Sequence, residues 1–336
     1  MSESTFDRRT ALKSLVGFGV AAVLLYVFGS VLGWESILSA LSKADPLPVA
    51  LACGSSLVAL TTWAKGWDVV LSSLSVEIPY RDLVPTYYAA TFADYVTPFG
   101  KAGGGPFVAA VLSADHEVSY EESLASVVTT DSLNLLPFFT FAGAGVVVLG
   151  VTGSVPTNVR PLVYALGVVA VCVPVLAYLV WRVRDRVTRL IARVLDPLAA
   201  RVGFLDAEGV EERVARFFSL IGDLGERRSW ALETIAFAYV GWVFFALPLW
   251  LAGRAMGVAL PLQLVAFIVP ASSMASLVPT PGGLGGVEAA VTGLLVTLAG
   301  VPTPTAAAIA LLYRVASFWF VLPVGGGATL WLTYRS

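Results

Sequence analysis

Charged side chains are scarce in this sequence. Lys and Arg together number 21 and Asp and Glu 23 among 336 residues, a share of 13%, which is about half that of an average soluble domain. Hydrophobic residues make up 57%, and the mean hydropathy is +0.81. A soluble domain of this length cannot bury so much apolar surface, and an intrinsically disordered chain does not contain it. The net charge of −2 also argues against nucleic acid as a partner.

Cysteine and histidine are almost missing as well. Cys53 and Cys172 lie inside apolar runs, and His116 is flanked by two acids. This composition excludes a disulfide framework and a Cys/His zinc site. No metalloprotease, P-loop or nucleophile-elbow motif is present. We therefore expect no metal, no cofactor and no enzymatic activity.

Long apolar runs are what the chain has in abundance. A helix needs about 20 apolar residues to cross the hydrocarbon core. Ser119 and Glu122 form a capping box that starts one span near Tyr120, and Pro304 suits the first turn of another. The predicted spans are Ser14–Trp34, Pro46–Ala64 (extending to about Leu71), Ser132–Gly150 (beginning near Tyr120), Pro161–Trp181, Thr234–Gly253 and a last one from Thr303 to about Trp331. The fold class is therefore an all-α polytopic membrane protein.

Two other apolar stretches, Leu83–Ser113 and Pro261–Gly300, are interrupted by glycine and proline. Each predicts a helix, a turn and a second helix. Such turns survive at membrane depth only where protein or a water-filled cavity surrounds them. The positive-inside rule places the tail 1–13 and the loop 182–230, which holds ten arginines, in the cytoplasm. Both placements agree only if the first stretch is a re-entrant hairpin, and they put both termini on the cytoplasmic side of the cell membrane.

The two halves of the chain also match at an offset of 182–183 residues. The segment 76–79 (VEIP) matches 258–261 (VALP), and Thr97-Pro98 matches Thr280-Pro281. Each half then has three spans and one broken hairpin, so the second half is inverted relative to the first. Repeat 1 and the first span of repeat 2 occupy 14–181, and the rest of repeat 2 occupies 231–332. Transporters with alternating access have this architecture, and paired broken segments indicate their binding site.

Helix N-termini that follow the glycine clusters favour anions such as a phosphate head group. Lys101 lies beside the first cluster, where it either adds a cation or snorkels to the surface. Glu288 follows the second cluster. It either complements the helix dipole or receives a proton or a cationic head group.

Asp131 and Arg314 occupy matching positions at the offset of 183, each about 15–18 Å into its span. A lone charge at this depth costs at least about 2.5–3.5 kcal/mol. We expect the two to pair in one conformational state, or to form a static ion pair. Asp94, in the first hairpin arm, is a further cavity candidate. Lys65 and Asp68 lie beside tryptophans and are interpreted as an interfacial anchor belt.

Two motifs, 97–106 (TPFGKAGGGP) and 278–288 (VPTPGGLGGVE), and the run 306–314 (AAAIALLYR) carry a resemblance to a known family. Over residues 12–332 the chain resembles the lysylphosphatidylglycerol synthase transmembrane region, also described as flippase-like membrane proteins. The resemblance places the functional acid and arginine on Glu288 and Arg314. Gly105 stands where the family usually has Glu, and Asp131 stands where it has Arg. The family's glycine loops correspond to Gly103, Gly104, Gly282, Gly283, Gly285 and Gly286.

Larger members of this family carry an aminoacyl-lipid synthetase or glycosyltransferase domain, so the resemblance implies traffic of lipid head groups. We expect a lipid translocase that binds a phospholipid or polyprenyl-phosphate-linked head group between the two hairpins. Two alternatives are an ion-coupled transporter of a small solute and a membrane partner of a separate synthetase or glycosyltransferase. The expected partners are membrane lipids.

Overall fold

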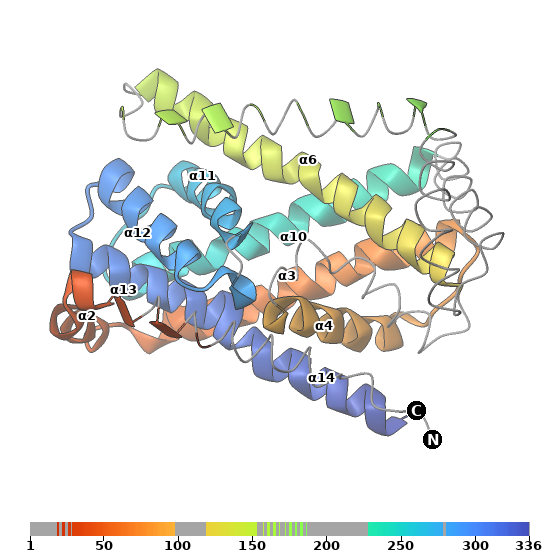
Figure 1. Cartoon of the computed structure of the whole chain (residues 1–336), viewed down its shortest axis with the longest axis horizontal. Coiled ribbons are helices and arrows are strands. Elements are labelled where there is room, and N and C mark those ends of the chain that lie inside the picture. Colours follow the sequence, from red (N-terminus) through yellow and green to blue (C-terminus); the bar gives the residue numbers. More distant parts are fainter. Residues whose placement is uncertain are drawn as a thin grey trace, which may run out of the picture.

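The computed structural model describes residues 29–97, 119–152, 228–277 and 280–335, with scattered positions of 19–27 and 157–186. Every regular element in these ranges is a helix (Figure 1), which confirms the all-α class. Most of the span predicted at 14–34, the turn of the first hairpin and nearly all of the loop 182–230 lie outside the described residues. The span predicted at 161–181 is described at isolated positions.

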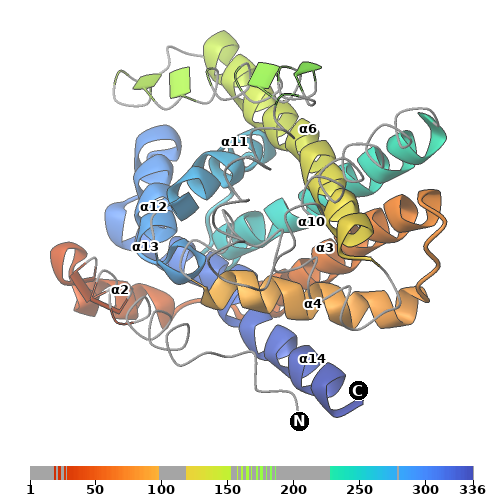
Figure 2. The same ribbon diagram turned by 45° about the vertical axis from the view of Figure 1, so that its right-hand side comes forward.

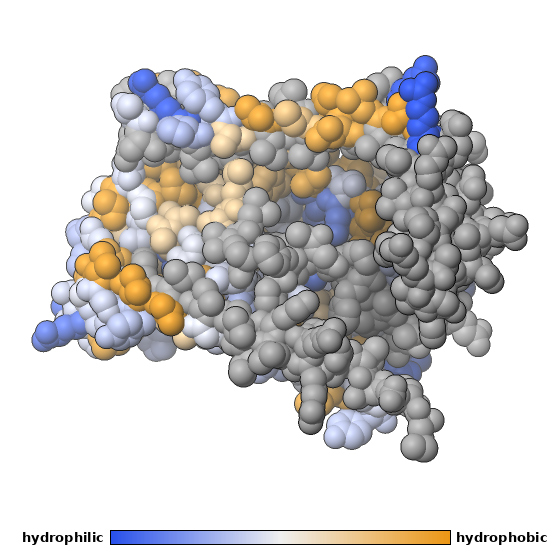
Figure 3. All heavy atoms as spheres, viewed as in Figure 1, coloured by the Kyte–Doolittle hydropathy of each residue, from blue (hydrophilic) through white to orange (hydrophobic). Residues whose placement is uncertain are grey.

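The α-helices of the described ranges are α2 Trp34–Leu41, α3 Pro46–Ser73, α4 Tyr80–Val96, α6 Tyr120–Thr152, α10 Arg228–Ala255, α11 Leu262–Ser273, α12 Gly286–Ala299, α13 Thr303–Arg314 and α14 Val321–Arg335. Two 3-10 turns, η1 Met274–Leu277 and η2 Pro281–Gly283, lie between α11 and α12. The π-helical segment η3 Val315–Trp319 lies between α13 and α14. Within the described residues, four stretches are long and apolar enough to cross a membrane: Pro46–Ser73, Ser229–Ala255, Pro281–Ala299 and Thr303–Arg335. Apolar side chains cover much of the coloured surface in Figure 3, and the most hydrophilic ones lie mainly at its edges. These features are those of a membrane protein.

Helices α3 and α10 form a central antiparallel pair and lie side by side in both views (Figures 1 and 2). At one end the backbone N–H of Asp45 donates to the carbonyl of Ala255 at 2.9 Å. Further along, the Ser55 hydroxyl donates to the carbonyl of Phe244 at 2.6 Å. Gly241 lies against the indole of Trp63, where an added Cβ would come within 2.3 Å of the ring nitrogen. Small residues therefore let these two helices approach closely.

Two further helix pairs flank the central one. Helix α14 packs on α4, where Gly325 lies against the carbonyl of Tyr88 and the side chain of Phe92. Helix α6 packs on α11, where Gly145 lies against Phe267. In each pair a glycine therefore lies directly against the neighbouring helix, where an added Cβ would clash.

Local signals placed several helix boundaries well, whereas α10 begins at Arg228 instead of Thr234, α14 continues to Arg335, and the end of the first span was wrong. Helix α13 begins at Thr303 with Pro304 in its first turn, and α3 begins at Pro46 behind the capping carboxylate of Asp45. The first span was predicted to end at Trp34. The helix breaks instead at Gly33, whose φ of 86° is left-handed, and Trp34 begins the new helix α2.

The capping box at the start of α6 is present, and it gives a test of local stability. The Ser119 hydroxyl accepts the N–H of Glu122 at 3.2 Å, while the Glu122 carboxylate accepts the N–H of Ser119 at 3.0 Å. Ser119→Ala is expected to lower the free energy of unfolding by about 1 kcal/mol, because it removes the hydroxyl that accepts the N–H of Glu122 at the start of the helix. Unfolding titrations in mixed micelles measure this loss, and Ser132→Ala, on the exposed face of α6, is the control.

Candidate functional site

The second glycine cluster folds into a tight loop between η1 and α12. Gly282, Gly283 and Gly285 have φ values of 55°, 68° and 84°, a region that side-chain-bearing residues rarely adopt. The hydroxyl of Thr280 donates to the carbonyl of Leu284 at 3.0 Å and ties the two ends of the turn together. As predicted, helix, Gly/Pro turn and helix follow one another here, and α12 begins at Gly286.

Glu288 occupies the first turn of α12 and is fully buried, with 0% of its surface exposed. One carboxylate oxygen accepts the backbone N–H of Gly285 at 2.7 Å, which caps the helix N-terminus. The other accepts the Nε–H of Arg314 at 2.9 Å. The first alternative for Glu288, that it complements the helix terminus, matches this geometry, and its other oxygen pairs with an arginine of the same chain. Whether it also receives a proton or a cationic head group stays a prediction.

Arg314 comes from the C-terminal end of α13 and is 6% exposed. Besides the carboxylate of Glu288, its guanidinium donates from an Nη atom to the carbonyl of Gly282 at 2.7 Å. The same group lies 4.5 Å from the ring centroid of Phe318, a cation–π distance. The arginine thus joins the glycine loop, the start of α12 and the segment that follows α13.

Electrostatics explain why this group holds together. A buried carboxylate or guanidinium alone carries a large desolvation penalty, which a charged partner and further hydrogen bonds offset. The N-terminus of α12, predicted as an anion site, is here satisfied by the Glu288 carboxylate.

Aromatic side chains extend the site to the first half of the chain. The segment η3 is π-helical, with the N–H of Phe320 bonded to the carbonyl of Val315 at 2.8 Å, and π-turns of this kind are frequent at functional sites. Tyr95, near the end of α4, donates to the carbonyl of Ser317 at 3.2 Å and stacks on Phe318 with 5.1 Å between ring centroids. Tyr95 and Phe318 were missed from the sequence. An aromatic residue four positions after an intramembrane arginine was the available signal for Phe318.

The other predicted residues lie elsewhere. Asp131 is exposed on α6, and both it and Asp94 are within electrostatic reach of Tyr87 on α4. The bonds of the Arg314 guanidinium go to Glu288 and Gly282, so this structure does not bring Asp131 to Arg314. Their pairing in another conformational state stays a prediction. Lys101, Gly103 and Gly104 lie outside the described residues.

Long apolar helices around a buried ion pair define the class as a polytopic α-helical membrane protein. Comparison with known families is more specific. The sequence model described as the lysylphosphatidylglycerol synthase TM region matches residues 14–325. The chain belongs to this family.

The curated relatives are similar along nearly their whole length. A UPF0104 membrane protein of Methanothermobacter thermautotrophicus is 24% identical over 322 residues, which cover 94% of this chain and 93% of that protein. A second from the same organism is 25% identical, over 93% of this chain and 90% of the relative. The UPF0104 membrane protein of Pyrococcus horikoshii is 20% identical, over 93% and 94% respectively. The match therefore joins this chain to membrane proteins that carry the same region on its own.

Proposed function

We propose that this protein translocates a lipid across the cell membrane, without enzymatic activity, by holding the head group beside the broken hairpin of its second half. The observation that carries the proposal is the buried Glu288–Arg314 pair on the glycine loop. A charged pair at membrane depth is costly and is typical of substrate pathways. Arginine is also the side chain best suited to phosphate, which lipid head groups share.

An inverted repeat supports alternating access. Helices α3 and α10 are both 28 residues long and begin at 46 and 228, an offset of 182. The 33-residue helix α6 begins at 120, and the 33-residue stretch Thr303–Arg335 begins at 303, an offset of 183. Since α3 and α10 pack antiparallel, a pseudo-two-fold axis between them relates the halves in this proposal. The broken segments are then re-entrant hairpins, and both termini are cytoplasmic.

Partner exchange at Arg314 is the mechanism we propose. In the present state the guanidinium is neutralised by Glu288. When a lipid enters, its phosphate replaces the carboxylate on Arg314, while Glu288 keeps its bond to the N–H of Gly285 and takes a proton or the ammonium of the head group. Rocking of the halves then exposes the site to the other leaflet, where Asp131 competes for Arg314 and releases the lipid.

Leaflet exchange in reconstituted liposomes tests this function. Fluorescent phospholipids are protected from a membrane-impermeant quencher only while they stay in the inner leaflet, so translocation appears as loss of protection. Arg314→Lys is expected to slow exchange about tenfold, because an ammonium cannot reproduce both bonds of the guanidinium fork. Arg254→Lys, at an exposed arginine of the same half, is the control.

Two results contradict the proposal. One is exchange no faster than in protein-free liposomes. The other is equal exchange by the wild type and the Arg314→Lys variant. The first result favours the alternative of small-solute transport.

A further inference from the structure

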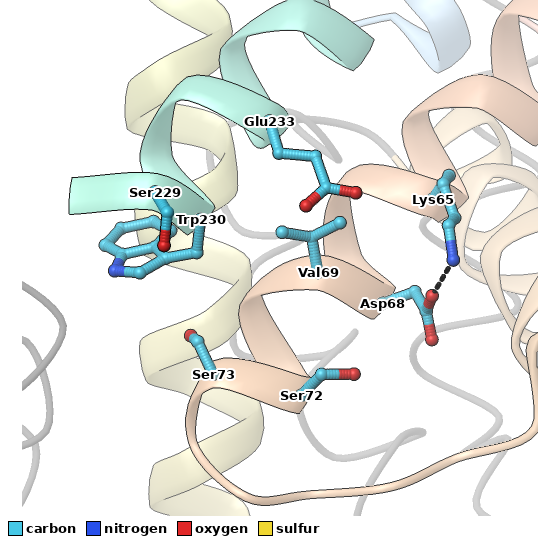
Figure 4. Close-up of a pocket in the computed structure, with 8 residues that line it drawn as sticks. All are labelled: Lys65, Asp68, Val69, Ser72, Ser73, Ser229, Trp230 and Glu233. Carbon is cyan, nitrogen blue, oxygen red and sulfur yellow. Dashed lines mark hydrogen bonds and ion pairs between the residues drawn. The ribbon is translucent and has the colours of Figure 1, made fainter. Parts of the chain in front are cut away.

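A second polar site lies between the end of α3 and the start of α10. It is a pocket of about 340 Å³. Figure 4 shows polar side chains from both helices converging on it, with Val69 between them. Its lining residues are Lys65, Asp68, Val69, Ser72, Ser73, Ser229, Trp230 and Glu233. None of these belongs to the Glu288–Arg314 centre.

The charges in this pocket are of both signs and come from two helices. The ammonium of Lys65 pairs with the carboxylate of Asp68 one turn along α3. Glu233 is contributed by α10 and points across Val69 toward α3 (Figure 4). Among the lining residues that the structure describes, two carboxylates therefore face one ammonium. A ligand that complements these residues needs a cation for the surplus negative charge and an acceptor for Lys65 and the hydroxyl of Ser229, because the Ser73 hydroxyl already donates to the carbonyl of Val70.

The helix packing itself does not require these polar groups. Under the proposed repeat, the offset of 182 relates Lys65 to Leu247, Asp68 to Trp250 and Glu233 to Leu51. At the other end of the same helix pair, the equivalent positions therefore hold apolar and aromatic residues. An interfacial anchor belt accounts for Lys65 and Asp68 on one helix, but not for Glu233 opposite them on another.

We propose that this pocket binds the head group of an amine-bearing phospholipid such as phosphatidylethanolamine. The phosphate lies against Lys65 and the hydroxyl of Ser229, and the ammonium lies between Asp68 and Glu233. In the proposed orientation the pocket opens at the cytoplasmic leaflet, where such a lipid arrives from the side. Among the described residues no cluster of three or more His, Cys, Asp and Glu is placed to hold a metal ion, which disfavours a metal as the occupant. Binding here requires no translocation.

Protection of a thiol in the pocket tests the proposal. Ser72 is exposed at the rim, so Ser72→Cys in a Cys53→Ala/Cys172→Ala background gives one thiol for a soluble maleimide. The full-length protein is placed in nanodiscs of phosphatidylcholine, alone or with phosphatidylethanolamine or phosphatidylglycerol. Phosphatidylethanolamine is expected to slow labelling about fivefold, the factor of one partly exposed charge pair, and phosphatidylglycerol is not.

Variants that remove one carboxylate show whether the protection from labelling depends on this pocket. Glu233→Gln is expected to abolish the protection, because the ammonium loses its partner on α10. Glu35→Gln makes the same change at an exposed residue on another helix, and protection is expected to persist. Equal protection by phosphatidylglycerol, no protection by either lipid, or full protection after Glu233→Gln each overturns the proposal. Leaflet exchange decides the proposed function separately.

Discussion

Arg314→Ala is expected to lower the free energy of unfolding by about 3–5 kcal/mol. The substitution leaves Glu288, which is 0% exposed, as a buried carboxylate without its cation. It also removes the donor to the carbonyl of Gly282. Unfolding in mixed detergent micelles, followed by circular dichroism, measures the loss. Arg254→Ala removes an exposed arginine and is expected to change stability by no more than about 0.5 kcal/mol.

A double-mutant cycle separates the ion pair from the loss of two side chains. Glu288→Ala alone leaves the guanidinium buried with its bond to the carbonyl of Gly282 and its contact with Phe318. Glu288→Ala/Arg314→Ala removes both charges, so it is expected to cost less than the sum of the single variants by about 2 kcal/mol or more. Additive losses would mean that the two side chains do not stabilise each other.

Sequence patterns predicted the helices well because their signals are local. Pro46 and Pro304 mark helix starts, and the Ser119–Glu122 capping box marks another, because each residue acts on backbone groups within one turn. The second broken segment was equally readable, since clustered glycine and proline interrupt a helix wherever they occur. These features need no knowledge of the tertiary packing.

Contacts between distant elements were not readable in the same way. Arg314 was matched to Asp131 by the repeat offset, whereas its bonds here go to Glu288 and Gly282. The offset identifies equivalent positions in the two halves, but two equivalent residues need not lie in contact with each other. The bond from Tyr95 to Ser317 was hidden for a related reason, because the π-helical segment after α13 shifts the helical register from Val315 onward in a manner that periodicity does not reveal.

The polar pocket between α3 and α10 could not be predicted from the sequence for a different reason. Lys65 and Asp68 beside tryptophans fit an anchor belt, and Glu233 lies 165 residues from Asp68 along the chain. Antiparallel packing of α3 and α10 brings these groups to the same pocket. Pocket-forming residues on different helices therefore become visible only when the helix pair and its register are known.

Gly283→Ala is expected to destabilise the protein by about 3 kcal/mol or more and to abolish leaflet exchange. Gly283 has a φ of 68°, so any side chain adds backbone strain. An added Cβ would also come within 2.5 Å of the Cα of Ser276, and a backbone atom cannot move aside as a flexible side chain can. The loop must then open, and its opening displaces the carbonyl of Gly282 from Arg314.

Gly293→Ala is the matched control for this prediction. Gly293 lies inside α12, ten residues further along, with no atom within 4 Å of an added Cβ. The substitution there is expected to stabilise the helix by about 0.5–1 kcal/mol, because alanine loses less backbone freedom than glycine on folding. The same chemical change thus has opposite signs at two positions of one segment. Equal unfolding midpoints for the two variants would contradict the strained loop, and normal exchange by Gly283→Ala would separate that loop from function.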